Sequence, residues 1–271
     1  INVMAGYSWQ HFYYRDLSIY KSNVTENLGT KEGWTYNDDE GRYIQNNNTP
    51  SPWENYLVSF FGRLNYNFKE RYLLTATLRQ DGSSRFSKSN RWGLFPSAAL
   101  AWSIINEPFM EKARDIMSNL KLRVGYGITG NSGGVDAYGT TTQAYVYTGN
   151  GLTLNGQNSS FTQYTGTYGS KDLGWEKSYN WNVGLDYGIL NNRVDGSIEW
   201  FKTTTKGLLF KRTLPITSGL TGWGSPLSIW QNIAETSNQG VEVTINSHNI
   251  KTKDFSWNTT LSVTWSKEKI E

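Results

Sequence analysis

Apolar and polar residues alternate with a period of two in segments of about ten residues that recur along the whole chain. One segment sets the apolar positions against charged or glycine positions: Leu122, Val124, Tyr126 and Ile128 against Lys121, Arg123, Gly125 and Gly127. Because successive side chains of a β-strand point to opposite faces, each segment predicts a strand with one apolar and one polar face. Such strands, beginning or ending in Trp or Tyr, are typical of a transmembrane β-barrel.

The alternation predicts about nine strands. They lie near residues 1–10, 54–68, 71–80, 91–103, 119–129, 177–189, 193–203, 238–247 and 255–266. Short turns at 67–70, 190–192 and 249–254 contrast with long links at 11–53, 81–90, 130–176 and 204–237. The link 104–118 contains Glu107-Pro108 and predicts a short helix. Because barrels collect short turns at one end and long loops at the other, the fold class is all-β, a transmembrane antiparallel β-barrel segment.

The composition agrees with a barrel and excludes other classes. Trp occurs 12 times and hydrophobic residues make up only 37% of the chain, so aromatic residues carry much of the apolar surface, as they do at membrane interfaces. No run of roughly 18 apolar residues predicts a membrane-spanning helix. The net charge is +3 from 26 basic and 23 acidic residues, and no basic tract predicts nucleic-acid binding.

Few residues offer catalytic, metal or cofactor chemistry. Cysteine is absent and the two histidines, His11 and His248, lie far apart in the sequence. The acidic loop 38–41 lacks the alternating spacing of a calcium loop. The G-x-G-x-x-G pattern at 125–130 lies in a predicted strand and is followed by Asn-Ser-Gly-Gly, which does not open the helix that dinucleotide binding needs. We therefore predict no enzyme activity, no metal site and no cofactor.

Three sets of residues follow from the strand pattern. The polar faces predict lumen-facing residues, some of which would face a plug: Arg63, Arg71, Thr75, Arg79, Arg123, Asp186, Asp195 and Glu199. The apolar faces predict a lipid belt: Tyr56, Val58, Phe60, Leu64, Leu74, Leu78, Leu100, Trp102, Val183, Leu185, Val194, Ile198, Trp200, Val243, Ile245, Leu261, Val263 and Trp265. Aromatic residues of the long links would either bind cargo or pack the loops together: Trp34, Tyr36, Trp53, Tyr145, Tyr147, Trp223 and Trp230.

Four sequence blocks carry a family resemblance. The first is Asp81, Gly82, Ser83, Ser84, Arg85 and Phe86, followed by 91–93 and 95–97, Arg-Trp-Gly and Phe-Pro-Ser. The others are 120–127, 173–177 and 238–242. Together, and in this order, they resemble the barrel of the SusC/RagA-type TonB-dependent outer-membrane transporters. The resemblance covers most of the chain.

The resemblance implies more than the residues do. Members of this family have barrels of about 22 strands, an N-terminal plug, a TonB box and a SusD-like surface lipoprotein as partner. They import oligosaccharides or oligopeptides through the bacterial outer membrane and are energised through the TonB complex. By this resemblance residues 1–271 form part of one barrel domain, in which Asp81 and Arg85 fix a loop at the outer rim.

The plug domain, the TonB box and a signal peptide are absent from this sequence, and an odd count of about nine strands does not close a bacterial barrel. We therefore expect a fragment of a larger protein, since an open sheet in a membrane leaves unpaired edges. Two alternatives stay open: a passive porin-like channel, and a secreted glycan-binding β-sandwich. The sandwich predicts a second sheet packed against the apolar face.

Overall fold

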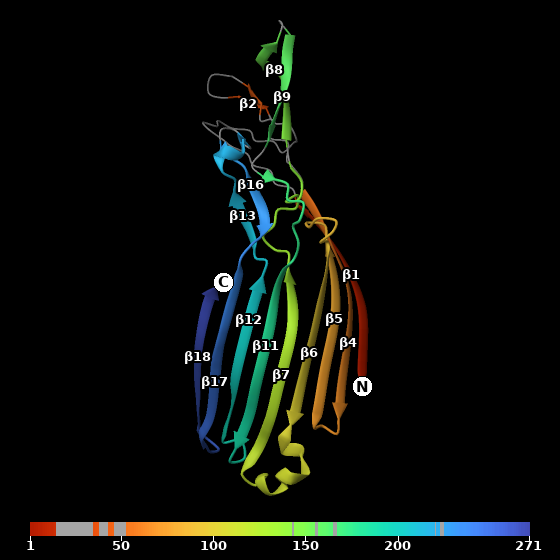
Figure 1. Cartoon of the computed structure of the whole chain (residues 1–271). Coiled ribbons are helices and arrows are strands. Elements are labelled where there is room, and N and C mark those ends of the chain that lie inside the picture. The colour runs from red at the N-terminus through yellow and green to blue at the C-terminus, as the bar shows by residue number, and fades with distance from the viewer. Residues whose placement is uncertain are drawn as a thin grey trace.

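The chain forms one long antiparallel sheet of nine strands, in the order β1-β4-β5-β6-β7-β11-β12-β17-β18 (Figure 1). The computed structural model describes residues 1–14, 35–37, 43–45, 53–142, 144–154, 157–164, 167–219, 221–222 and 225–271. The strands are β1 Asn2–Tyr14, β4 Trp53–Phe68, β5 Tyr72–Ser83, β6 Trp92–Ser103, β7 Met117–Asn131, β11 Glu176–Ile189, β12 Val194–Lys206, β17 Glu235–Lys251 and β18 Ser256–Ile270. The nine predicted strands are confirmed, and most extend a few residues further than predicted.

The long links contain strands that the sequence did not reveal. They form the hairpins β2 Thr35–Asn37 with β3 Tyr43–Gln45, β8 Ala144–Leu154 with β9 Gln157–Tyr164, and β14 Thr221–Gly222 with β15 Ser225–Pro226. A three-stranded sheet joins β10 Thr167–Tyr168, β16 Ser228–Asn232 and β13 Leu209–Thr213, and a 3₁₀ helix, η3, spans Ile216–Ser218. In Figure 1 the labelled strands β2, β8 and β9 lie above the long strands, and β13 and β16 lie above the upper ends of β11 and β12. The sequence analysis predicted no strands in these links.

Tight connections occupy the opposite end of the sheet. Lys69 and Glu70 adopt φ of +53° and +56°, a left-handed pair that closes the β4–β5 hairpin in the sense that matches strand twist. The backbone N–H of Glu70 donates to Asn67 Oδ1 at 3.0 Å and fixes this turn. The predicted helix in 104–118 is confirmed as two short 3₁₀ helices, η1 Ile104–Asn106 and η2 Pro108–Ala113.

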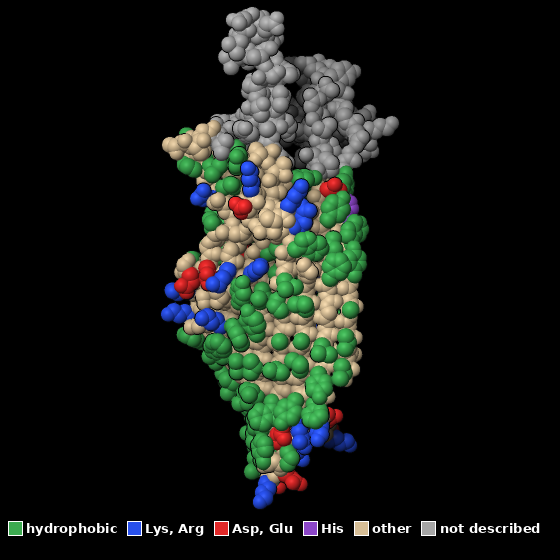
Figure 2. Space-filling view, turned by 45° about the vertical axis from the view of Figure 1, so that its right-hand side comes forward, with side chains coloured by type: hydrophobic (Ala, Val, Ile, Leu, Met, Phe, Trp, Pro, Cys, Tyr) green, Lys and Arg blue, Asp and Glu red, His purple; other side chains and the backbone are tan. Residues whose placement is uncertain are grey.

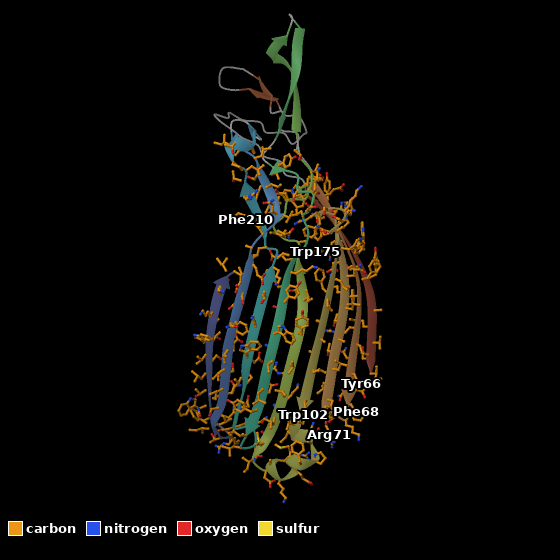
Figure 3. The ribbon with its side chains drawn as sticks, in the orientation of Figure 1. Tyr66, Phe68, Arg71, Trp102, Trp175 and Phe210 are labelled. Atoms are coloured by element: carbon orange, nitrogen blue, oxygen red, sulfur yellow. The ribbon has the colours of Figure 1, made fainter. Side chains whose placement is uncertain are left out.

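Glu107 ties these two helices to the sheet. Its buried carboxylate accepts the Tyr72 hydroxyl at 2.7 Å and Trp102 Nε1 at 2.9 Å, two groups that lie opposite each other on β5 and β6. Arg71 approaches the same carboxylate at 3.6 Å. The hydrogen bond from Tyr72, then that from Trp102, lowers the pKa of Glu107. Figure 3 places Arg71 and Trp102 together at this end, with Tyr66 and Phe68 at the end of β4.

One face of the sheet is apolar, and no layer of described residues packs against it. The register puts the whole predicted lipid belt on that face. Leu100 is 57% exposed and Val263 55%, values that a core position would not show. Figure 2 shows hydrophobic side chains gathered over the middle of this surface, with charged side chains below it. Among the described residues no second sheet packs on this face, which contradicts the β-sandwich alternative.

The described residues contain no helix that is both long and apolar enough to cross a membrane.

Replacing Val183 by Arg tests the orientation of the sheet. Val183 lies at the middle of the apolar face, opposite Val124 and Trp200, so a charge there should cost roughly 2–4 kcal/mol in a bilayer. We expect less heat-resistant folded protein on gel electrophoresis and less protein in the outer-membrane fraction. Thr264→Arg is the matched control, because Thr264 lies on the polar face one residue from Trp265, which continues the Val183 row. Equal assembly of the two variants would contradict the assignment of faces.

Candidate cargo path and outer mouth

The polar face of the sheet holds a three-residue ion network centred on Arg123 of β7. Arg123 donates from Nε to Asp186 Oδ2 at 2.9 Å and from Nη2 to Asp186 Oδ1 at 2.8 Å, a bidentate pair across β7 and β11. Its Nη2 also donates to Glu199 of β12, which accepts a further hydrogen bond from Asn182 Nδ2 at 3.4 Å. Three neighbouring strands are thus linked by charge on one face.

Glycine makes room for this network. A Cβ atom at Gly184 would lie 2.9 Å from Arg123 Nη2 and 3.3 Å from Glu199 Cγ, so the guanidinium lies directly over the Gly184 backbone. Gly184 pairs with both Arg123 and Glu199 in the sheet register. The glycine therefore lets the guanidinium lie flat and reach carboxylates on two strands.

A hollow of about 280 Å³ lies beside the network. Its polar-face floor is made of Leu73 and four small residues, Thr75, Ala99, Ala101 and Gly125, with Arg123 and Asn182 at its edge. A Cβ atom at Gly125 would contact nothing within 4 Å, so this part of the face is open. The arrangement offers a recess with one cation and one amide at its margin, suited to a polar side chain or ligand group.

Apart from Arg71, the other predicted lumen residues share this face but not this network. Arg79 donates to both carboxylate oxygens of Asp81 at 2.8 Å and to Ser59 Oγ at 3.0 Å, near the upper end of β5. Asp195 accepts from Asn246 Nδ2 at 3.0 Å, and Arg63 lies opposite Thr77. Arg71 lies in the turn before β5 and pairs with Glu107, as described above. That the face lines a lumen stays a prediction.

A small hydrophobic core holds the loops above the sheet. It consists of Phe86, Val135 and Leu173, which are 1%, 3% and 0% exposed, with Trp175 and Trp230 packed against it. We call this group the loop core. Phe86 belongs to the family motif, and its ring lies 4.9 Å from that of Trp175. Three links that are distant in sequence therefore meet at one point, where Figure 3 labels Trp175.

Arg85 braces the loop core from the same motif. Its Nη1 donates to the carbonyl oxygens of Ser132 at 3.2 Å and Val135 at 3.1 Å, which joins the link after β5 to the link after β7. Burial lowers the pKa of Arg85, and Asp136 opposes that effect. The motif hydroxyls also bond locally: Tyr56 N–H donates to Ser84 Oγ at 2.9 Å and Arg85 N–H to Ser83 Oγ at 3.3 Å. These contacts hold the motif in place against β4 and the link after β7.

Two glycines, Gly93 and Gly130, leave room for the ring of Phe95 of β6 beneath the loop core. Phe95 is 6% exposed, and its Cζ would lie 2.1 Å from a Cβ at Gly130 and 2.4 Å from one at Gly93. The ring also packs edge-on against Trp175 at 5.2 Å. No larger residue fits at either glycine unless Phe95 moves, which explains the glycines at these positions of β6 and β7.

Asp136 forms an ion pair that the sequence did not predict. Its Oδ2 accepts from Trp230 Nε1 and from Lys211 Nζ, both at 3.0 Å, and joins the link after β7 to strands β16 and β13. Lys211 Nζ also lies 5.7 Å from the centre of the Trp230 ring. Burial alone would raise the pKa of Asp136, but the hydrogen bonds from Trp230 and Lys211 lower it below its ordinary value.

The structure places the predicted cargo aromatics in different settings. Trp34 and Trp223 lie outside the described residues; Tyr36 lies in β2, and Tyr145 and Tyr147 lie in β8. Trp53 begins β4 and stacks on Tyr14 at 5.1 Å, while Trp230 bonds to Asp136 within the protein. The two whose side chains the structure describes both have contacts within the protein. Cargo binding by this set stays a prediction.

The described residues contain no group of three or more His, Asp or Glu side chains that could hold a metal ion. Residues 38–41, the acidic loop, lie outside the described residues. His11 Nε2 lies 3.0 Å from Glu54 Oε2, and His248 Nδ1 lies 2.8 Å from Asn258 Oδ1. Each histidine thus has its own local partner.

Comparison with known proteins settles the family. A family model described as "TonB dependent receptor-like, beta-barrel" matches residues 2–271. The chain belongs to this family. Its strands are therefore those of an outer-membrane β-barrel, and the all-β prediction and the predicted bacterial outer-membrane location are confirmed.

Three individual proteins show which members of the family the chain resembles. The chain is 38% identical to the TonB-dependent receptor SusC of Bacteroides thetaiotaomicron, over 99% of this chain and 25% of that protein. It is 33% identical to TonB-dependent receptor P3 of Formosa agariphila, over 100% of this chain and 25% of that one. The solved RagAB peptide transporter matches with a TM-score of 0.69 and 28% identity, over 82% of this chain and 23% of that chain. The chain thus spans about a quarter of the length of these relatives.

Removing the central cation of the polar face tests the ion network. Arg123→Gln should lower the free energy of unfolding by about 1–3 kcal/mol, because Asp186 and Glu199 lose their shared cation while partly buried. The measurement is urea unfolding of the full-length protein in detergent. The double variant with Glu199→Gln should recover part of the loss, because it removes one of the two carboxylates left unpaired. Additive losses would show that the two residues do not interact.

The Asp136 pair predicts an acid-sensitive loop core. Because the pKa of Asp136 is lowered on folding, its contribution is fully present above the ordinary aspartate pKa of 3.8 and is lost as the pH falls through the lowered value. Hydrogen exchange of residues 134–142 and 209–213 should therefore accelerate in that acidic range. In Asp136→Asn exchange should be faster at neutral pH and should lose this part of the acid response. An unchanged acid response in the variant would contradict the assignment.

Proposed function

We propose that the protein is an active outer-membrane importer of oligosaccharides or oligopeptides, energised through TonB and working with a SusD-like surface lipoprotein. The observation that carries the proposal is a single-layer sheet with an exposed apolar face and an ion-paired polar face, in a chain that belongs to the TonB-dependent receptor-like barrel family. The two faces are suited to lipid and to a wet lumen. The proposal includes no chemistry on the cargo: the protein would act as a transporter and not as an enzyme.

The described residues have distinct parts in this proposal. The polar face, with Arg123, Asp186 and Glu199, would form part of the lumen wall against which a plug or a cargo group rests. The hollow over Gly125 gives that wall a recess. The loop core around Phe86 would hold the outer mouth in shape, so that loop residues above it present a fixed surface to the cargo and to the lipoprotein partner.

The descriptions of the RagAB neighbours and the chemistry of aromatic side chains bear on the class of cargo. The RagAB neighbours are described as a peptide transporter and a peptide importer, which supports the peptide class. The aromatic residues predicted to bind cargo suit either class, because an aromatic ring stacks on a sugar face and also packs against an apolar peptide side chain. The proposal therefore keeps both cargo classes and leaves the distinction to uptake assays.

Uptake in cells with and without TonB tests the proposal. A strain producing the full-length protein should import labelled oligopeptide or oligosaccharide, and deletion of TonB should abolish that import while leaving the protein in the outer membrane. Import that continues without TonB would support the passive porin-like channel instead. Deletion of the proposed SusD-like surface lipoprotein should lower import at limiting cargo concentration.

A further inference from the structure

A polar groove lies at the rim of the sheet, above the apolar face. It has a volume of about 460 Å³ and is lined on one side by Glu54 and Tyr56 of β4, which share the apolar-face register with Val58 and Phe60. On the other side lie Ser84, Lys88, Arg91 and Lys171 from two separate links. The groove is thus bounded by the strand surface that would face lipid and by the loops above it.

Three of the lining residues are cations without a partner in the described part of the protein. Lys88 and Lys171 are exposed and form no ion pair with any described residue, and Arg91 forms none either. Because these three cations line one groove and have no anionic partner among the described residues, the groove points to an anionic ligand.

Among the described residues, Glu54 is the one carboxylate that lines the groove, and it does not cancel these cations. Glu54 Oε2 lies 3.0 Å from His11 Nε2 and accepts the Tyr56 hydroxyl at 3.0 Å, so its charge is directed at the strand surface. His11 is stacked on Tyr56 with ring centres 4.5 Å apart. Counted over the described lining residues, the groove keeps an excess of positive charge on its loop side, with an aromatic wall opposite.

The position of the groove along the sheet indicates which kind of anion it binds. Figure 2 shows Lys and Arg side chains directly above the hydrophobic surface of the sheet, the level of lipid headgroups when that surface lies in a membrane. Basic pockets at this level bind phosphorylated lipid headgroups, and phosphate accepts several charge-assisted hydrogen bonds at once. We propose that the Lys88–Arg91–Lys171 groove binds the phosphate of an anionic lipid of the outer leaflet, at a site separate from the cargo path. The inference rests on the membrane orientation in the proposed function.

Lipid retention by the full-length protein tests this inference. Protein purified in mild detergent is placed in bilayer discs of phosphatidylcholine with or without lipid A, and bound lipid A is counted by native mass spectrometry. The triple variant Lys88→Gln, Arg91→Gln, Lys171→Gln should retain at least about tenfold less lipid A than wild type. Lys206→Gln is the matched control, because Lys206 lies at the same rim, pairs with Glu235 at 3.2 Å and is outside the groove. It should retain as much as wild type.

Three outcomes would overturn the assignment. The first is equal retention by the triple variant, and the second is an equal loss in the Lys206→Gln control. The third is complete displacement of lipid A by inorganic phosphate, which would make the groove a free-phosphate site. The single variants Lys88→Gln and Lys171→Gln, each on an exposed residue, keep the test valid if the triple variant misfolds. Cargo uptake is measured in parallel: normal uptake with unchanged lipid retention refutes only the lipid site, whereas loss of outer-membrane location refutes the proposed function as well.

Discussion

Backbone amides that face hydrocarbon have no water to bond, so a sheet inside a membrane must pair them from strand to strand without interruption. The register here meets that requirement over most of the sheet. Within the described nine-stranded sheet, pairing shifts by one residue only near Gly188 and near His248, both at the end with the tight turns. Continuous pairing keeps every second residue on the same side across nine strands, and this is what separates an apolar face from a charged one.

Different side-chain contacts stabilise the structure at three levels along the strands. At the turn end, the Glu107 carboxylate, bonded to Tyr72 and Trp102, holds the 3₁₀ helices against the sheet. In the middle, the Arg123 network links three strands on the polar face. At the other end, Phe86 and Arg85 draw distant links into the loop core. The polar contacts supplement the backbone ladder at levels where the sheet has no second layer to pack against.

The sequence predicted the strands because their signal is local. Alternation over ten residues needs no knowledge of tertiary structure, and the register bears it out from the lipid belt to the shared face of Asp186 and Glu199. The structure of the loops could not be predicted from a local pattern. The strands β8, β9, β13 and β16 went unpredicted, and so did the bond between Asp136 and Trp230, because residues 94 positions apart meet there. No periodic pattern marks such contacts, and the sequence alone left open whether Trp230 binds cargo or packs the loops together.

Thiol accessibility along β11 tests the central claim most directly, because this chain contains no cysteine. Single cysteines are placed at Asn182, Val183, Leu185 and Asp186 in the full-length protein, from which any other cysteine is removed. In intact outer membranes a charged maleimide should label positions 182 and 186 and spare 183 and 185, while a spin label at 183 or 185 should be relaxed by lipid-dissolved oxygen. Uniform labelling of all four positions, or the reverse order, would contradict a sheet with one face in lipid and the other in water.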